Sequence, residues 1–286
     1  MADGNTKPGM ILKGTQIEVL NPWLPKCPKP FALFDFDGTI SLIREGWQQV
    51  MIPMMVDILR QYMRREETEE DISGLVTEFV TVLTGKQTIY QMMAFEDEVH
   101  KRGGEALSAG DYKDMYLEHL WERIKDRVEG LKNGTLRPED YVVPGALELL
   151  ENLHRRGVQL FIASGTDQPN VIDEATALGV AHYANGQIYG ATEDLLNCSK
   201  AMVIEQLLRE NHLQGSDLLG AGDGFVEIEE TKKVGGVAIG VAVDEQNPTG
   251  PVDEWKRERL GGVGADIIIP NFLEQETLLA YLWGEL

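Results

Sequence analysis

Cysteine is scarce in this sequence. Of its 286 residues only Cys27 and Cys198 are cysteines, and they stand far apart. Two such residues provide neither the disulfide framework of a small secreted domain nor the close spacing of a zinc-binding motif. We therefore expect no structural disulfides and a reducing compartment, and we predict a cytoplasmic location.

Long apolar runs are also missing. A helix that crosses a membrane needs about 20 consecutive apolar residues, and no stretch of this chain approaches that length. The first residues, MADGNTKPGMILKG, do not combine a basic end with an apolar run, so we expect no secretory signal. The sequence predicts no membrane partner.

Basic residues are few relative to acidic ones. The chain has 26 Lys and Arg against 47 Asp and Glu, a formal net charge of −21. Such a surface repels nucleic acids and anionic lipids unless basic side chains gather in a stripe. The densest basic pair, Arg64–Arg65, is followed directly by acidic residues. We expect no nucleic-acid partner, and an anionic substrate would need a locally positive site or a bound cation.

The remaining composition, 43% hydrophobic and 26% charged, is typical of a globular protein. Three regions differ in pattern. Residues 1–23 form a polar N-terminal tail with one possible short strand at TQIEVL. Residues 45–135 carry apolar side chains at helical spacing in successive segments. Residues 136–286 alternate between strand and helix, which predicts a parallel sheet with helices on both faces.

The short apolar run FALFDFD, which begins at Phe31, belongs with the alternating region because it has the character of a buried strand. The helical block is therefore an insertion after the first strand. We predict an α/β fold with a Rossmann-like, three-layer core of parallel strands, made of residues 24–44 and 136–286. Residues 45–135 form an inserted α-helical domain.

Polar residues stand where the predicted strands end. Asp35 and Asp37 follow the first strand, Ser164 and Asp223 end two others, and Lys200 begins the helix before the Asp223 strand. Ligands of open α/β sheets bind outside the carboxyl ends of the strands. Two neighbouring carboxylates do not both ionise readily unless a cation neutralises them. Oxygen ligands from Asp35, Asp223 and a backbone carbonyl suit Mg²⁺.

Four segments resemble, in order, the motifs of haloacid dehalogenase superfamily phosphatases: DFDGT, FIASGT, NCSKAMVIEQLL and LLGAGDGFVEIEE. The inserted helical domain resembles the α-helical cap of that family. The resemblance runs from residue 31 to about residue 270 and leaves the N-terminal tail outside it. One DxDGT is moderately specific, whereas four ordered motifs at predicted strand ends and helix starts are a strong indication.

The resemblance implies roles for the acidic and basic residues of these motifs. Asp35 would be the nucleophile that forms an aspartyl-phosphate, and Asp37 would be the general acid and base. Lys200 would bridge the nucleophile and the phosphate. Mg²⁺ would be held by Asp35, the backbone carbonyl of Asp37 and Asp223. Glu227 departs from the family pattern, which usually has Asp there, so it would ligate directly, act through water, or be a solvated acid at a helix start.

The resemblance also implies phosphate-binding groups. Thr39, Ser164 and the amide of Gly165 would hold phosphate oxygens together with Lys200. For Ser164 the alternative is a polar residue that opens the next helix. In that case Thr166 or Asp167 would make the better helix cap.

Two further basic residues are candidates for substrate binding, one beside the first motif and one in the helical region. Arg44 comes just after the first motif and is predicted to reach the leaving group. Lys86, or its neighbour Gln87, lies in TGKQTIYQ and is predicted to face the substrate. The alternative for this segment is a simple break between two helices.

The sequence therefore leads to a Mg²⁺-dependent phosphatase that hydrolyses a small phosphorylated metabolite. One alternative is a phosphomutase of the β-phosphoglucomutase type, which needs the same two aspartates of the first motif. Another is a non-catalytic binding module on the same fold. Dehalogenase and phosphonatase activities are disfavoured because those relatives lack the second carboxylate, which Asp37 supplies here. The sequence does not address oligomeric state.

Overall fold

The structure is a computed structural model that describes residues 7–192 and 200–286. Its internal contacts divide the chain into two compact units. The core unit contains the chain up to Ile43 together with Gly130–Leu286, and the helical unit contains Arg44–Glu129.

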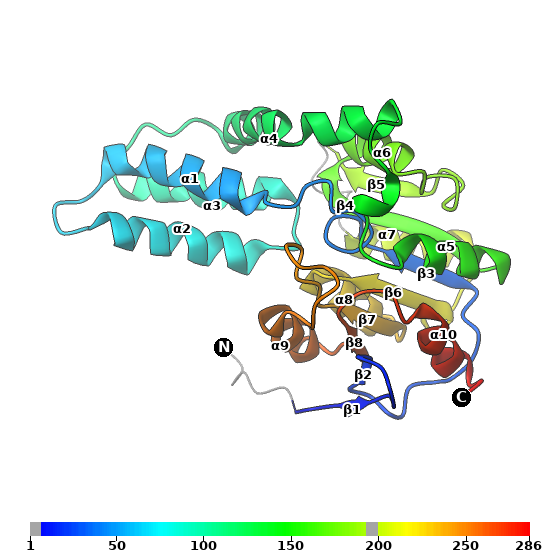
Figure 1. Ribbon diagram of the computed structural model, residues 1–286. Coiled ribbons are helices and arrows are strands. Elements are labelled where there is room, and N and C mark those ends of the chain that lie inside the picture. The colour runs from blue at the N-terminus through cyan, green and yellow to red at the C-terminus, as the bar shows by residue number, and fades with distance from the viewer. Residues whose placement is uncertain (1–6, 193–199) are drawn as a thin grey trace. The chain divides into compact units, whose positions relative to one another are not determined.

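A mixed sheet of eight strands, counted over the described residues, forms the centre of the core unit (Figure 1). The strands are β1 (Met10–Ile11), β2 (Glu18–Val19), β3 (Phe31–Phe34), β4 (Gln159–Asp167), β5 (Ile188–Ala191), β6 (Leu218–Gly222), β7 (Val237–Val241) and β8 (Ile267–Ile269). Their order is β1-β2-β8-β7-β6-β3-β4-β5. Strands β3 to β8 pair in parallel, as predicted, whereas β2 pairs antiparallel with both β1 and β8.

Helices cover both faces of this sheet. They are α5 (Ala146–Arg155), α6 (Gln168–Ala177), α7 (Lys200–Glu210), α8 (Phe225–Lys233), α9 (Glu254–Gly262) and α10 (Gln275–Trp283). Along the sheet, the connection from β3 to β4, which contains α5, and the connection from β5 to β6, which contains α7, run in opposite directions. Because such connections between parallel strands are right-handed, α5 and α7 lie on opposite faces of the sheet. Helix α7 packs Leu207 against Leu33 and Phe161, and α10 packs beside α5. The α/β, Rossmann-like class with a three-layer core is confirmed.

The two N-terminal strands extend the sheet beyond the parallel core. Ile17 and Val19 are each 1% exposed, so this segment contributes to the core. Glu18 forms a two-pronged ion pair with Arg257 of α9, at 2.9 Å from Nε and 2.7 Å from Nη2. The Glu18 carboxylate also accepts the backbone N–H of Gly9 at 2.6 Å. These contacts tie β2 to α9.

A second buried carboxylate stands at the start of β8, at the amino-terminal edge of the parallel strands. Asp266 is 1% exposed. It accepts the Lys232 ammonium at 2.8 Å and the backbone N–H of Ala238 at 2.9 Å. The side-chain amide of Asn21 donates to it at 2.7 Å. Asp266 thus joins α8, β7 and the N-terminal segment.

The helical unit consists of α1 (Gln48–Leu59), α2 (Glu69–Leu83), α3 (Thr88–Lys101) and most of α4 (Ala109–Lys132), with a 3₁₀ turn at Arg60–Tyr62. Two further 3₁₀ turns, Pro138–Asp140 and Gly215–Asp217, belong to the core unit. Buried methionines such as Met51, Met55 and Met92 fill its interior, as their helical spacing predicts. None of the helices in the described ranges has both the length and the apolar character that spanning a membrane requires.

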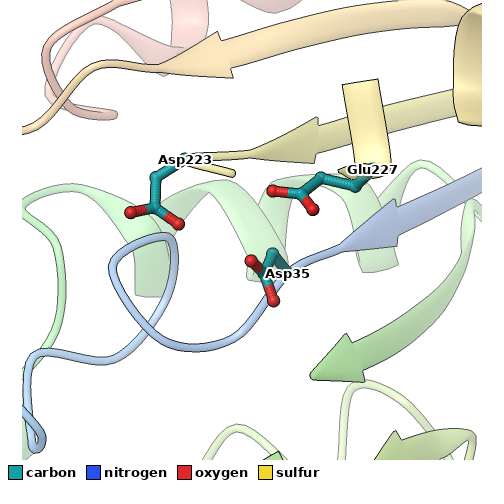
Figure 2. Close-up of side chains that lie close together, drawn as sticks. All are labelled: Asp35, Asp223 and Glu227. Carbon is teal, nitrogen blue, oxygen red and sulfur yellow. The ribbon is translucent and has the colours of Figure 1, made fainter. Parts of the chain in front are cut away.

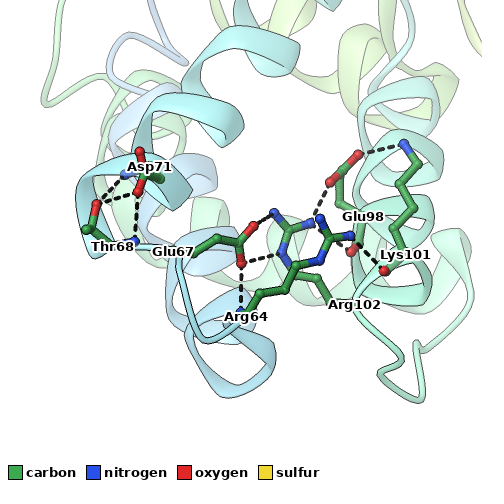
Figure 3. A network of polar contacts seen from close by, with 7 residues as sticks. All are labelled: Arg64, Glu67, Thr68, Asp71, Glu98, Lys101 and Arg102. Atoms are coloured by element: carbon green, nitrogen blue, oxygen red, sulfur yellow. Dashed lines mark hydrogen bonds and ion pairs between the residues drawn. The ribbon is translucent and has the colours of Figure 1, made fainter.

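A polar network closes one end of the helical unit (Figure 3). The Arg102 side chain, 4% exposed, pairs with Glu67 at 2.7 Å and Glu98 at 2.6 Å. The Arg64 guanidinium donates to the carbonyl of Lys101 at 2.8 Å. Because Glu67 precedes α2 and Glu98 belongs to α3, Arg102 links the two helices.

We predict that Glu18→Gln lowers the free energy of unfolding by about 2 kcal/mol at neutral pH, because hydrogen bonds between charged groups are stronger than neutral ones. The Arg257 hydrogen bond lowers the pKa of Glu18 below its usual value of 4.5. A carboxylate whose pKa is lowered on folding stabilises the folded state at pH values above its usual pKa. This contribution to the free energy of unfolding disappears as the pH falls through the folded-state pKa. Urea unfolding should therefore show the largest difference from wild type near pH 7 and a shrinking one below about pH 4.5. Glu205→Gln, on the exposed side of α7, is the control, and an equal loss in both variants would contradict this account.

We also predict that Arg102→Met destabilises the protein by about 1 to 2 kcal/mol, because it removes the buried guanidinium that pairs with Glu67 and leaves Glu98 only the exposed Lys101. The matched control is Lys101→Met. Lys101 pairs with the same Glu98 at 2.7 Å, but its side chain is 61% exposed, so solvent screens the pair. Thermal unfolding should show a lower midpoint for Arg102→Met alone, and equal midpoints for the two variants would refute the burial argument.

Candidate active site

The order of the strands brings the predicted site residues to one edge of the sheet. Strands β6, β3 and β4 are neighbours and run parallel. Asp35 follows β3, Asp223 follows β6, and Ser164 lies near the carboxyl end of β4. This is the edge at which open α/β sheets bind ligands. The motif residues just before Lys200, including Cys198, lie outside the described residues. The other cysteine, Cys27, is an exposed free thiol.

Lys200, the first residue of α7, joins two carboxylates. Its ammonium lies 2.9 Å from Asp35 Oδ1 and 2.8 Å from Glu227 Oε2. The three side chains are only 8%, 8% and 2% exposed, in the order Lys200, Asp35 and Glu227. A cation at a helix start is opposed by the helix dipole, so these carboxylates account for its position. Asp35 Oδ1 also accepts the backbone N–H of Phe36 at 2.8 Å.

Asp35, Asp223 and Glu227 form a cluster that we name the acidic cluster (Figure 2). One oxygen from each lies within 4.8 Å of the others. Burial raises the pKa of Asp35 well above its usual value of 3.8, the charges of Glu227 and Asp223 raise it further, and Lys200 opposes the shift. Burial also raises the pKa of Asp223. The cluster thus has a shortage of positive charge.

The turn after Asp35 depends on Gly38. Its φ of +72° suits glycine. A Cβ at this position would lie 2.4 Å from Asp223 Oδ2. Next to it, the Thr39 hydroxyl accepts the backbone N–H of Asp223 at 2.9 Å and is fully buried. The DFDGT turn is therefore packed directly against the end of β6.

Asp37 is held by different partners from those of Asp35. The hydroxyl groups of Ser164 and Thr166 donate to Asp37 Oδ2 at 3.0 Å and 2.8 Å. The backbone N–H of Thr166 in turn donates to Ser164 Oγ at 2.9 Å, and Gly165 lies between the two. Thr166, which the sequence suggests only as a helix cap, thus contacts Asp37 directly. Asp167 occupies the N-cap of α6 without a side-chain cap hydrogen bond.

Glu227 is buried, so the expectation of a solvated acid at a helix start is wrong. Its Oε1 accepts the backbone N–H of Gly224 at 2.6 Å, and its Oε2 accepts the Lys200 ammonium. Glu227 therefore caps α8 and positions Lys200. Glu227 also belongs to the acidic cluster. Its binding to a metal ion stays a prediction.

A second lysine reaches the acidic cluster from α9. Lys256 lies 2.9 Å from Asp223 Oδ2 and 3.1 Å from Glu245 Oε1, and its side chain is 11% exposed. Burial raises the pKa of Glu245, and the charges of Asp223 and Asp37 add to the shift. Neither Lys256 nor Glu245 lies in a recognisable motif. No spacing signal in VDEQNPTGPVDEWKRERL distinguishes them from ordinary surface charges.

Arg44 and Lys86 belong to the helical unit, and their binding to a substrate stays a prediction. Arg44 is its first residue. Lys86 is exposed between α2 and α3, with its ammonium 5.8 Å from the centre of the Tyr90 ring. The helix break predicted for this segment is confirmed, since α2 ends at Leu83 and α3 begins at Thr88.

The donor atoms of the site fit a hard divalent cation. Five carboxylates gather here, and the two ammonium groups of Lys200 and Lys256 balance only part of their charge. The carboxylates are those of Asp35, Asp37, Asp223, Glu227 and Glu245. Side-chain oxygen atoms without sulfur or imidazole ligands are typical of magnesium and calcium sites.

Comparison with solved structures finds proteins of the same fold. Among solved structures, a predicted phosphoglycolate phosphatase from Haemophilus somnus is 17% identical, with a TM-score of 0.56 over 87% of this chain and 97% of that chain. A β-phosphoglucomutase from Clostridium difficile is 12% identical, with a TM-score of 0.61 over 90% and 98%. CbbY from Rhodobacter sphaeroides, solved with phosphate, is 18% identical, with a TM-score of 0.53 over 86% and 96%. At such identities the likeness shows a shared fold.

Among curated proteins, none matches this sequence significantly. The model of one protein family, the haloacid dehalogenase-like hydrolases, matches residues 31–235. This match spans well over half of the chain and includes all four motifs. The chain belongs to the haloacid dehalogenase-like hydrolase family.

Proposed function

We propose that this protein is a Mg²⁺-dependent phosphatase that hydrolyses phosphate monoesters of small metabolites. The observation that carries the proposal is the separate placement of two carboxylates. Asp35 is paired with Lys200 at 2.9 Å, whereas Asp37 is held by two hydroxyl groups. Carboxylates in different environments suit different tasks, here a nucleophile and a proton carrier. Membership of a hydrolase family supports a hydrolytic reaction.

Asp35 is the proposed nucleophile. Its Oδ1 is fixed by Lys200 and the backbone N–H of Phe36, so we assign the attack on phosphorus to Oδ2. A bond forms between Oδ2 and phosphorus while the bond from phosphorus to the ester oxygen breaks, which yields an aspartyl-phosphate and an alcohol. Lys200 positions the carboxylate and contributes positive charge beside the phosphoryl oxygens.

Asp37 is the proposed proton carrier. In the first step it donates a proton to the departing ester oxygen. In the second step it takes a proton from a water molecule, whose oxygen attacks phosphorus and displaces Asp35 to release inorganic phosphate. The hydroxyl groups of Ser164 and Thr166 orient its carboxylate for both steps.

A further part of the proposal concerns the groups that bind phosphate. We propose that Ser164, the amide of Gly165 and the Thr39 hydroxyl bind phosphoryl oxygens together with Lys200. Ser164 and Thr39 are 5% and 0% exposed. These groups are thus shielded from solvent, which strengthens hydrogen bonds to an anion.

We propose that Mg²⁺ is held by Asp35, Asp223 and the backbone carbonyl of Asp37, with Glu227 beside it. When bound, the ion would supply positive charge that keeps Asp35 ionised and withdraws electron density from the phosphoryl group. The acidic cluster and the raised pKa of Asp35 support this assignment.

We further propose that the helical unit is the family's α-helical cap and that Arg44 and Lys86 contribute to substrate binding. The location proposed for the enzyme is the cytoplasm. A small phosphorylated substrate is supported by two relatives of the same fold, named as a predicted phosphoglycolate phosphatase and a β-phosphoglucomutase.

We predict that Asp35→Asn lowers phosphate release from p-nitrophenyl phosphate at least about a thousandfold, because the amide is a poor nucleophile. Asp37→Asn should slow turnover by about 10²- to 10⁴-fold. This variant should still release a burst of about one equivalent of p-nitrophenol, because that leaving group departs without a proton and the aspartyl-phosphate then persists. Rapid mixing with detection of p-nitrophenol distinguishes the two variants.

The control for both variants is Asp173→Asn, whose exposed side chain pairs with Lys132 on α4; it should retain the wild-type rate. Undiminished activity of Asp35→Asn would refute the proposed nucleophile. A phosphomutase would instead convert a hexose 1-phosphate, primed by a bisphosphate, into its isomer with little free phosphate. A folded wild-type protein that does neither would favour the non-catalytic binding module.

Removal of divalent cations with EDTA should abolish phosphate release, and added Mg²⁺ should restore it, because Lys200 and Lys256 offset only part of the charge of the acidic cluster. Asp223→Asn should raise the Mg²⁺ concentration for half-maximal activity by at least about tenfold. Asp217→Asn, in the 3₁₀ turn before β6, is the control. Full activity in EDTA would exclude the metal from the mechanism.

A further inference from the structure

Lys256 and Glu245 lie at the acidic cluster, yet the proposed reaction assigns them no task. Lys256 extends from α9, and Glu245 follows the end of β7. Their side chains are 11% and 21% exposed. Burying ionised groups costs free energy unless the charges are paired, so their presence here calls for an explanation.

Within the acidic cluster, Lys256 contacts Asp223. Its ammonium contacts Asp223 Oδ2 at 2.9 Å, while the other oxygen, Oδ1, faces the Thr39 hydroxyl at 3.5 Å. Lys200 contacts the other two members of the acidic cluster, Asp35 and Glu227. The cluster is therefore flanked by two ammonium groups, one of which contacts a proposed metal ligand.

A positive charge next to a metal ligand opposes the binding of a cation in two ways. It repels the cation, and it competes for the carboxylate oxygen that the cation would use. In a buried site such interactions are weakly screened. Lys256 should therefore weaken cation binding at Asp223.

Glu245 acts in the opposite direction. Its carboxylate lies 3.1 Å from the same ammonium, so it shares Lys256 with Asp223 and adds negative charge near the cluster. Glu245 also gives the lysine a partner that remains when Asp223 binds a cation. The flexible stem of lysine allows such a shift without movement of the backbone.

We propose that Lys256 and Glu245 form a pair that sets the affinity of the acidic cluster for its divalent cation, with Lys256 lowering the affinity and Glu245 limiting that effect. This inference rests on the proposed function, because it takes Asp223 to be a ligand of the cation. The competing explanation is that Lys256 only neutralises two buried carboxylates. That explanation predicts a loss of stability in either variant but no opposite changes in affinity.

The test is calorimetric titration of the metal-free protein with Mg²⁺. We expect Lys256→Met to lower the dissociation constant for Mg²⁺ by about tenfold, equivalent to about 1.4 kcal/mol. We expect Glu245→Gln to raise it by about threefold or more. The matched control is Lys232→Met, which breaks the pair with Asp266 at the opposite edge of the sheet and should leave the dissociation constant unchanged.

A second readout covers the case in which Lys256→Met is too unstable for titration. Glu245→Gln keeps the pair between Lys256 and Asp223, so it should fold, and weaker Mg²⁺ binding by this variant supports the proposal. Where Lys256→Met folds, Mg²⁺ should raise its unfolding midpoint more than it raises that of wild type, because a tighter ligand stabilises the folded state more.

The outcomes separate this inference from the proposed function. A wild-type protein that binds Mg²⁺, together with a Lys256→Met variant that binds it equally or more weakly, overturns the inference and leaves the phosphatase proposal standing. An unchanged or lower dissociation constant for Glu245→Gln overturns it as well. If neither wild type nor Lys256→Met binds Mg²⁺, both the inference and the proposed metal site are wrong.

Discussion

The structure of the site depends on one buried ammonium group shared by two carboxylates. Lys200, Asp35 and Glu227 come from the start of α7, the end of β3 and the first turn of α8. None of the three would be stable in this interior alone, because an unpaired buried charge is costly. Their mutual contacts hold three segments of the core unit together. The geometry of the site therefore depends on the packing of these segments, and their packing depends on the ion pairs.

The shared ammonium also explains why the edge of the sheet remains negatively charged. One lysine cannot balance Asp35, Glu227 and Asp223 together, and burial makes the imbalance more costly. Lys256 offsets part of it from the other side. The remaining excess is local and is not a consequence of the net charge of −21 over the whole chain. The proposed cation site depends on this local excess of negative charge.

The sequence predicts the parallel core and the meeting of Asp35, Asp37, Ser164, Lys200 and Asp223 because each of these residues ends a strand or begins a helix in a regular α/β pattern. Neighbouring parallel strands place such ends side by side. It predicts a possible short strand at TQIEVL, where β2 lies, but it does not predict β1, since a two-residue strand is too short to show a periodic pattern. The sequence does not single out Thr166, Glu245 and Lys256, because their contacts with the site arise from the tertiary structure and their local sequence resembles an ordinary turn, loop or charged helix.

Helix α9 shows one consequence of how the chain is assembled. Two consecutive side chains of this helix face different neighbours, with Lys256 on Asp223 and Arg257 on Glu18 of β2. Both α9 and β2 lie outside residues 31–235, the part that matches the family. A protein shortened to the matched part would keep every motif residue and lose both the lysine beside Asp223 and the strand that anchors its helix. The proposed cation site would then lack a neighbour that the longer chain supplies.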